Sequence, residues 1–211
     1  YMQRAFAEIQ KTVLSGVATW RQGVHASALP VPAEKEVTVY LPLRVNFGGG
    51  WSDTPPYCNE HGGTVLNAAV LLNGEYPVEV CVRQLKEPKV ILESADMGTY
   101  GEFTDIDALQ DCHNPFDAFA LHKAALIACG IIPAEGGSLN SITDRIGGLY
   151  LSTQMHNVPK GSGLGTSSIL AGACVKALFK YFGLPCTEPD LYNHAMCMEQ
   201  IMSTGGGWQD Q

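Results

Sequence analysis

A run of glycines between a strand-like and a helix-like stretch restricts most strongly what this chain folds into. Residues 159–168 read PKGSGLGTSS, with a glycine at every second position from 161 to 165. Glycine lets a backbone adopt positive φ and approach a ligand closely. Residues 150–158 before it alternate like a strand, and a helix is expected from about Ser167 to Phe182, ending before Gly183. The sequence therefore predicts a strand–loop–helix unit.

This unit favours an anion-binding site. The unpaired N–H groups and the positive dipole end of the helix face the loop, which suits phosphate groups. Hydroxyls at Thr166, Ser167 and Ser168 lie where a Mg²⁺ shell or a helix N-cap requires oxygens. The alternative is a flexible loop with a serine N-cap. The P-loop pattern GxxxxGK[ST] does not occur, nor does GxGxxG followed by an acidic residue about 20 positions later.

A second glycine-rich loop follows a strand expected over residues 37–47. Three successive glycines stand between Arg44 and Asp53 in the segment RVNFGGGWSDTPP. An aspartate there accepts hydrogen bonds from sugar hydroxyls, and an arginine stabilises a carboxylate or a developing phosphate charge. The alternative is a structural Arg–Asp pair that rigidifies a turn. Trp51 is either a core residue or a wall of a sugar pocket.

The third element places two carboxylates near the end of the sequence. Glu199 stands near the end of a helix expected over residues 188–202, and Asp210 follows within the segment GGGWQDQ. Glu199 is a candidate metal ligand and Asp210 a candidate base. The alternative is that both are solvated surface groups. Trp208, like Trp51, is either a core residue or a pocket wall.

The remaining sequence predicts a mixture of strands and helices. Residues 64–74 favour a strand or a short helix. The other expected elements are an amphipathic helix over 3–21, a loop over 26–36, strands over 78–85 and 89–95, and a helix over 115–129. Because strands and helices do not alternate strictly, we expect an α+β fold rather than a doubly wound sheet.

Composition excludes several classes of function. The 211 residues include 13 Lys and Arg against 21 Asp and Glu, a net charge of -8, which does not favour non-specific nucleic-acid binding. No apolar run reaches the roughly 20 residues of a membrane span, and no secretory leader is recognisable. The seven scattered cysteines contain no CxxC pair, so we expect reduced, mostly buried thiols in the cytoplasm. Because the first residue is Tyr1, we expect a piece of a longer protein.

Taken together and in this order, the three loops resemble those of the GHMP small-molecule kinases, the family of galactokinase and of homoserine, mevalonate and phosphomevalonate kinases. PKGSGLGTSS is similar to the family's phosphate-binding motif PxxxGLGSS, RVNFGGGWSD to its substrate motif, and GGGWQDQ to the segment that carries its base. FGGGWSDTPP, GSGLGTSSILA and STGGGWQDQ together resemble the fucokinase branch, including the kinase half of bifunctional fucokinase/fucose-1-phosphate guanylyltransferases. The resemblance covers roughly residues 37–211.

The resemblance implies a fold and a domain organisation. Residues 37–211 would form the N-terminal GHMP domain, of the ribosomal protein S5 domain 2-like class, truncated at the catalytic GGxxDQ segment. Residues 1–36 would form a preceding helix and linker. By the same resemblance, the family's C-terminal domain would lie outside this chain, and that part of the parent chain is the expected partner that closes the active site.

The resemblance also implies roles for matching residues. Asp210 would be the general base that takes the proton of the sugar's anomeric hydroxyl, and Arg44 would position that carboxylate and stabilise charge. Ser167 and Glu199 would hold Mg²⁺ between the ATP phosphates. The implied ATP-binding residues are Pro159, Gly161, Ser162, Gly163, Leu164, Gly165, Thr166, Ser167 and Ser168. The implied substrate-binding residues are Trp51, Ser52, Asp53, Gly206 and Gly207.

The implied activity is an ATP- and Mg²⁺-dependent sugar 1-kinase that converts L-fucose to L-fucose 1-phosphate in GDP-fucose salvage. Galactokinases carry Glu-His where this chain has Gly50-Trp51 before Ser52-Asp53, which argues against galactose. Two alternatives remain. One is a GHMP kinase for another sugar, such as a heptose phosphate, and the other is a non-catalytic nucleotide- or sugar-binding module.

Overall fold

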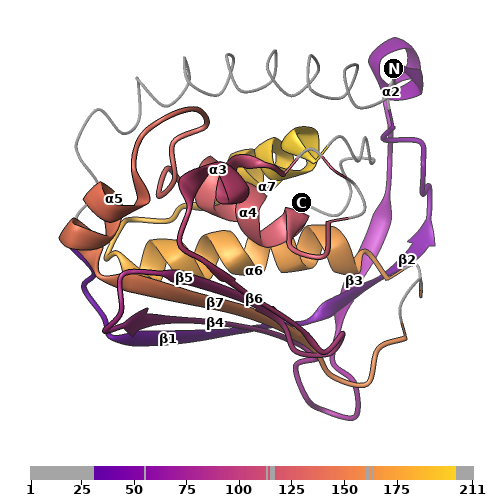
Figure 1. Cartoon of the computed structure of the whole chain (residues 1–211). Helices are drawn as coiled ribbons and strands as arrows, with labels where there is room; N and C mark the ends of the chain where they lie inside the picture. The colour runs from indigo at the N-terminus through magenta and orange to yellow at the C-terminus, as the bar shows by residue number, and fades with distance from the viewer. Residues whose placement is uncertain are drawn as a thin grey trace.

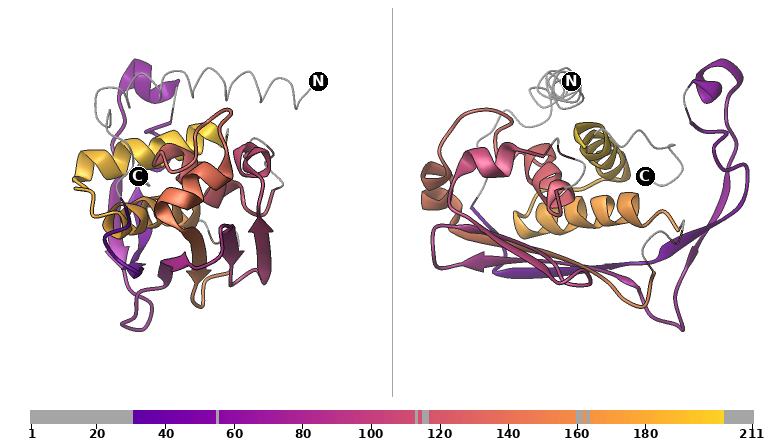
Figure 2. Two further views of the ribbon diagram at one scale, coloured as in Figure 1. Left: turned by 60° about the vertical axis from the view of Figure 1, so that its left-hand side comes forward. Right: turned by 45° about the vertical axis from the view of Figure 1, so that its right-hand side comes forward.

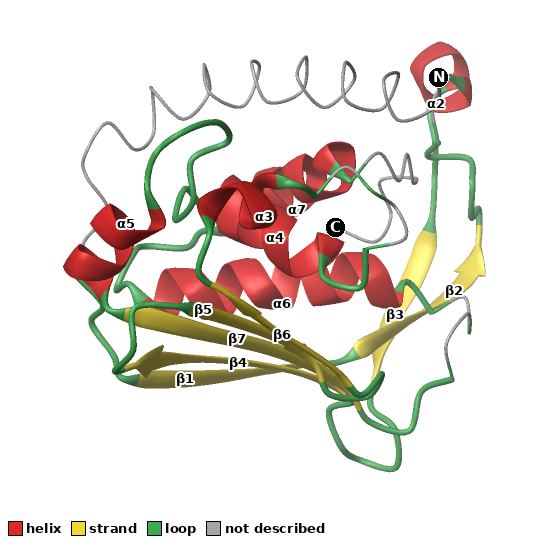
Figure 3. Cartoon of the chain, viewed as in Figure 1, coloured by secondary structure: helices red, strands yellow, loops and turns green. Residues whose placement is uncertain are grey.

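The computed structural model describes residues 31–54, 56–112, 114, 117–159, 162 and 164–202. These residues form a five-stranded sheet, in the order β1-β4-β7-β5-β6, and a two-stranded ribbon of β2 and β3. Helices α3 to α7 lie on one side of the sheet, and the ribbon projects beyond its end (Figure 1). The turned views show the same separation (Figure 2), as does colouring by secondary structure (Figure 3). The helix expected over 3–21 lies outside the described residues.

The five-stranded sheet follows the alternation of its sequence. Its strands are β1 (Glu36–Leu41), β4 (Val78–Leu85), β7 (Gly148–Met155), β5 (Val90–Ser94) and β6 (Thr99–Phe103). All neighbours pair antiparallel except β5 and β7, which pair parallel. In β4 the valines at 78, 80 and 82 are buried, while the residues between them lie on the face away from the core. The α+β prediction is confirmed.

The structure divides one expected strand into two separate strands. Residues 37–47 were expected to be continuous, but β1 ends at Leu41 and β2 (Leu43–Gly48) begins after Pro42. Proline has no N–H to donate to a sheet ladder, so the chain leaves the large sheet at this residue. Strand β2 then pairs with β3 (Leu66–Val70) in the separate ribbon. This change of partner carries Arg44 away from the large sheet.

The two long helices agree with their terminal signals. Helix α6 (Thr166–Tyr181) ends before Gly183, which has φ +65°. Helix α7 (Glu188–Ile201) begins with a reciprocal capping box between Thr187 and Asp190. Helix α4 (Ala120–Ala128) begins five residues later than expected, because the Asp117 carboxylate accepts a hydrogen bond from the Phe119 amide at 2.8 Å and holds a turn there.

The short elements were not expected from the sequence. They are α2 (Tyr57–His61), within the predicted loop over 48–63, together with β6, α3 (Ile106–Gln110) and α5 (Leu139–Ile146). Each is too short to establish a hydrophobic period. The core lies between the sheet and α4, α6 and α7, where Leu126, Leu151 and Leu178 are fully buried. No disulfide joins the seven cysteines, all of which are described. Among the described helices, none has the length and apolarity to cross a membrane.

Candidate active site at the start of helix α6

The glycine-rich loop leads from β7 into α6 and ends in a glycine cap. Gly165 is the N-cap of α6, with φ +68° and ψ +24°, and its carbonyl accepts the Ile169 amide at 3.2 Å. The alternative of a serine N-cap is therefore wrong. Because glycine has no side chain, it cannot satisfy the first amides of α6 as a capping serine would. Within the loop, the Ser162 amide donates to the Pro159 carbonyl at 3.2 Å, forming a turn.

A buried carboxylate meets this helix end. The Ser168 hydroxyl donates a hydrogen bond to Oε1 of Glu199 on α7, and both residues are only 7% exposed. Ser167, one residue earlier, is exposed. Successive helical residues point about 100° apart, so the two serines face different surroundings. Glu199 is thus brought to the loop as expected, but the serine that contacts it is Ser168.

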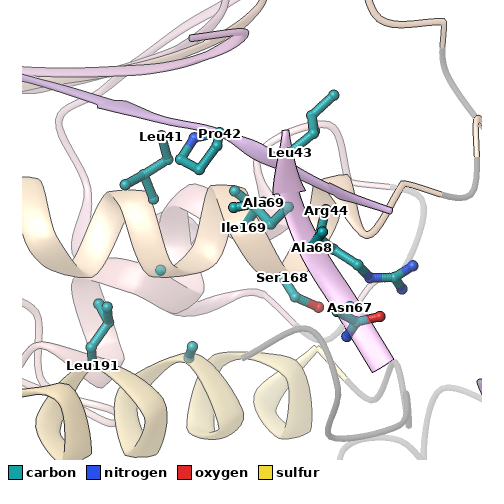
Figure 4. Close-up of a pocket in the computed structure, with 12 residues that line it drawn as sticks. Leu41, Pro42, Leu43, Arg44, Asn67, Ala68, Ala69, Ser168, Ile169 and Leu191 are labelled. Carbon is teal, nitrogen blue, oxygen red and sulfur yellow. The ribbon is translucent and has the colours of Figure 1, made fainter. Parts of the chain in front are cut away.

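Arg44 and Ser168 line one pocket. The pocket has a volume of about 350 Å³ and lies between the β2–β3 ribbon and helices α6 and α7. Arg44, Asn67 and Ser168 gather at one end of it (Figure 4). The rest of the lining is apolar or glycine: Leu41, Pro42, Leu43, Ala68, Ala69, Ile169, Gly172, Leu191 and Ala195. Among the described lining residues, the polar side chains therefore lie at the end next to the start of α6.

Hydrogen bonds of Ser52 hold together the two ends of the loop that follows β2. The Ser52 hydroxyl accepts the Thr64 amide at 3.1 Å and donates to the Gly49 carbonyl at 2.6 Å. Gly49 has φ +79°, and a Cβ there would lie 1.8 Å from the Thr64 carbonyl oxygen, so only glycine fits. The hydroxyl of Ser52, expected to contact the substrate, thus holds the two ends of the loop together.

The two residues beside Ser52 differ in exposure. Asp53 is 9% exposed, whereas Trp51 is 73% exposed, so the interpretation of Trp51 as a core residue is wrong. Trp51 also has φ +72°, a conformation that costs a residue with a Cβ about 1 kcal/mol. Such outliers occur preferentially at functional sites. The indole is available to a ligand that approaches from solvent.

Several expected site residues lie outside the described residues. They are Gly161, Gly163, Gly206, Gly207 and Asp210, together with Trp208 as a candidate pocket wall. The assignment of Asp210 as the base therefore stays a prediction.

Comparison with known proteins identifies the family. Residues 137–211, from the turn before α5 to Gln211, match the GHMP kinases N terminal domain. These residues belong to a GHMP kinase N-terminal domain. Over 99% of its length the chain is 36% identical to the L-fucokinase/L-fucose-1-P guanylyltransferase of Bacteroides fragilis. Over 84% of its length it is 38% identical to the bifunctional fucokinase/GDP-fucose pyrophosphorylase of Arabidopsis thaliana. It spans 22% and 16% of those two proteins, respectively.

A further relative is similar in sequence, and a solved structure has a similar fold. The chain is 28% identical over 84% of its length to the D-glycero-alpha-D-manno-heptose 7-phosphate kinase of Campylobacter jejuni, of which it spans 47%. Its fold matches the Lactococcus lactis galactokinase structure with a TM-score of 0.60 at 18% identity, covering 93% of this chain and 44% of that one. The GHMP kinase fold expected from the loops is confirmed.

The chemistry of the GHMP domain's buried Ser–Glu pair fits a magnesium ion. Mg²⁺ prefers oxygen ligands and takes only one or two from the protein, keeping water and phosphate oxygens for the rest. The Ser168 hydroxyl and the Glu199 carboxylate supply such oxygens beside the loop. Across the described ranges no cluster of three His, Cys, Asp or Glu side chains is suited to a metal, so a site built from protein carboxylates alone does not occur there.

One polar residue of the pocket was not expected from the sequence. Asn67 on β3 lies at the polar end beside Arg44, and its Oδ1 accepts a hydrogen bond from Asn46 Nδ2 at 2.9 Å. The available signal was a single amide within the otherwise apolar run TVLNAAVLL. A buried polar residue in such a run normally has a partner or a function.

Proposed function

We propose that this chain forms the nucleotide- and substrate-binding part of an ATP-dependent sugar kinase that phosphorylates L-fucose at its anomeric hydroxyl. The observation that carries the proposal is the grouping of Arg44, Ser168 and Glu199 around the uncapped N-terminus of α6. The similarity to two bifunctional fucokinases, at 36% and 38% identity, supports L-fucose as the sugar.

The phosphate groups of ATP would lie against the glycine-rich loop and the first amides of α6. Pro159, Ser162, Leu164, Gly165 and Thr166 are the described residues that would line them. A glycine cap leaves these amides to the ligand, and the helix dipole favours negative charge there.

The roles that we propose for Ser167 and Ser168 differ from those expected from the sequence. Because Ser168 contacts Glu199 and Ser167 is exposed, we assign Ser168 and Glu199 to Mg²⁺ and Ser167 to the phosphate oxygens. Mg²⁺, when bound, neutralises charge on the β- and γ-phosphates. The protein oxygens hold that position, and burial strengthens their effect.

The transfer step needs little covalent chemistry from the protein. The sugar's O1–H proton passes to Asp210, O1 bonds to the γ-phosphorus, and the bond to the β–γ bridging oxygen breaks to release ADP. Arg44 would orient that carboxylate and stabilise developing charge. Asp53, Gly206 and Gly207 would bind the sugar, as would Trp51, whose exposed ring suits the C–H face of a carbohydrate. Further parts of the parent chain would complete the site.

The experiment that tests this is ADP release from ATP and Mg²⁺ with L-fucose, D-galactose, D-mannose and a heptose 7-phosphate in parallel. It is run on this chain and on a version that continues past Gln211. We expect turnover with L-fucose and its loss in Asp210→Asn, with nucleotide binding retained. Asp144→Asn, an exposed aspartate on α5, is the matched control and should keep full turnover.

A heptose phosphate is the second candidate substrate, because the heptose 7-phosphate kinase of Campylobacter jejuni is similar over 84% of this chain. Turnover with the heptose phosphate and not with L-fucose would favour it. Nucleotide binding without turnover on any sugar would instead favour a binding module. Cytoplasmic GDP-fucose salvage is the setting that the fucokinase assignment implies.

A further inference from the structure

We propose that His156 and Glu79 form a positioning pair that fixes where the chain enters the glycine-rich loop. The inference rests on the proposed function of that loop in phosphate binding. Neither residue belongs to the glycine-rich motifs, and neither would touch the nucleotide itself.

The pair holds the end of β7 to β4 at two points. His156 Nε2 lies 2.7 Å from Glu79 Oε2, and because a carboxylate only accepts, Nε2 carries the proton and donates it. The His156 amide also donates to the Pro77 carbonyl at 2.8 Å. The last registered pair of the two strands is Val78 with Met155, so His156 extends the pairing by one residue.

The held residue lies directly before the loop. The chain turns at Asn157, which has φ +59°, and only Asn157 and Val158 separate His156 from Pro159. Since each residue spans at most about 3.6 Å, the place of His156 limits where the loop begins. At the other end, Gly165 and the contact of Ser168 with Glu199 fix where the loop joins α6. The chain is thus held in place on both sides of the loop, at His156 before it and at Gly165 and Ser168 after it.

We expect the His156–Glu79 pair to affect the position of the glycine-rich loop more than the free energy of unfolding. Burial in β4 and β7 alternates, and Glu79 belongs to the set of residues that faces away from the helices. The side chains of His156 and Glu79 are 37% and 27% exposed. Partly exposed pairs contribute little to folding. Breaking this one should therefore loosen the loop while changing the melting temperature only slightly.

The experiment compares His156→Ala, Glu79→Ala and the double variant with wild type, using the full chain. The first readout is hydrogen exchange of residues 157–168 in nucleotide-free protein, followed by KM for MgATP, kcat and melting temperature. We expect faster exchange confined to this segment and a KM for MgATP raised about fivefold, with kcat less affected. The double variant should be no worse than either single one, because both remove the same interaction.

Two further variants separate positioning from general stability. His156→Gln retains a donor at a similar place and should restore most of the affinity. Arg83→Met removes another contact between β4 and β7, in which the guanidinium lies 4.2 Å from the Tyr150 ring centroid. It should leave the exchange of the loop and KM unchanged.

The outcomes are separable from those of the proposed function. If amide hydrogen exchange of residues 157–168 is unchanged in both single variants, the positioning role of His156 and Glu79 is wrong, whether or not the protein binds ATP. Faster exchange throughout the molecule, matched by Arg83→Met, also overturns it, since the pair would then be a general structural contact. A wild-type protein that binds no ATP contradicts the proposed function, while loop exchange still decides the role of His156.

Discussion

Ser168 in the first turn of α6 donates a hydrogen bond to Glu199 in the last turn of α7. The contact joins residues 31 positions apart and places a buried carboxylate at the end of the glycine-rich loop. Burying a charged group is unfavourable unless it has partners. The hydroxyl of Ser168 is such a partner and helps to hold the carboxylate at this place.

Glu199→Gln keeps the size of the side chain and its ability to accept from Ser168, but removes the charge. We expect kcat to fall at least about 100-fold at saturating Mg²⁺ if the charge acts on the metal, a loss typical of a removed transition-state contact. Steady-state ADP release measures it. Glu188→Gln, an exposed carboxylate on the same helix, is the control and should retain wild-type kcat. Wild-type turnover in Glu199→Gln would contradict the assignment.

Ser168→Ala and Ser167→Ala should differ in stability. The first variant removes the hydrogen bond to buried Glu199 and should lower the free energy of unfolding by about 1–3 kcal/mol. The second changes an exposed side chain and should stay within about 0.5 kcal/mol of wild type. Urea denaturation measures both. Equal losses in the two variants would show that Glu199 does not distinguish the serines.

Gly49→Ala should disrupt the loop between β2 and β3 more than Gly62→Ala does. Both glycines have positive φ, but a Cβ at Gly49 would collide with the Thr64 carbonyl, whereas a Cβ at Gly62 meets nothing within 4 Å. Gly62 has φ +73° and ψ +166°, so we expect about 1–3 kcal/mol of backbone strain in Gly62→Ala. The collision at Thr64 should make the loss of stability in Gly49→Ala larger still. Thermal unfolding compares them, and the same rank order should appear in the affinity for the sugar. An identical melting temperature in the two variants would refute the close approach at Thr64.

His122 should make stability depend on pH. Burial lowers the pKa of His122 from 6.5 to about 4. Because the folded pKa lies below the unfolded one, the contribution is present above pH 6.5 and is lost as the pH falls toward 4. Between pH 7.5 and pH 5 the loss should be about 2 kcal/mol in the free energy of unfolding.

Denaturation at the two pH values measures the effect of His122. His122→Gln should reduce the difference between them, while His61→Gln, at an exposed position, should not. A pH dependence unaltered in His122→Gln would assign it to other groups.

Gly172→Ala should stabilise α6. Gly172 is buried within the helix, and an added Cβ would lie 3.9 Å from Leu191 Cδ1, an ordinary contact. Replacing a helical glycine by alanine gains about 1 kcal/mol where space allows. Gly183→Ala is the opposite case, because φ is +65° and the Cβ would lie 2.9 Å from that of Ala33. The melting temperature should rise in the first variant and fall in the second.

Periodicity and end signals predicted the elements that carry the candidate site. Strand β4 agrees with its alternating valines and helix α6 with the stop at Gly183, and helix α7 agrees with the helix expected over residues 188–202. The break at Pro42 was harder to predict, because the proline was its one signal and the alternation of apolar residues continues through it, while the two halves pair with different strands. The sequence does not specify which partner each half takes.

Helix phase does not identify the serine that meets Glu199. Ala171, Cys174 and Leu178 follow Ser167 at helical spacing and are buried, just as Gly172, Val175 and Phe179 follow Ser168. Both serines thus lie above buried parts of the helix, and their different exposure arises in the first turn. The pairing itself was not available, because Glu199 reaches it only through the packing of α7 on α6.

The glycine at position 165 couples the formation of the first turn of α6 to the binding of an anion at that turn. A helix that begins at glycine lacks a side-chain cap, which relative to glycine is worth about 0.3 kcal/mol, and its first amides are left to be satisfied from outside by an anion. Linkage is reciprocal, so a change that frays the first turn must also weaken the binding of such an anion. In the proposed ATP site, nucleotide affinity would thus also report how completely the longest described helix is formed.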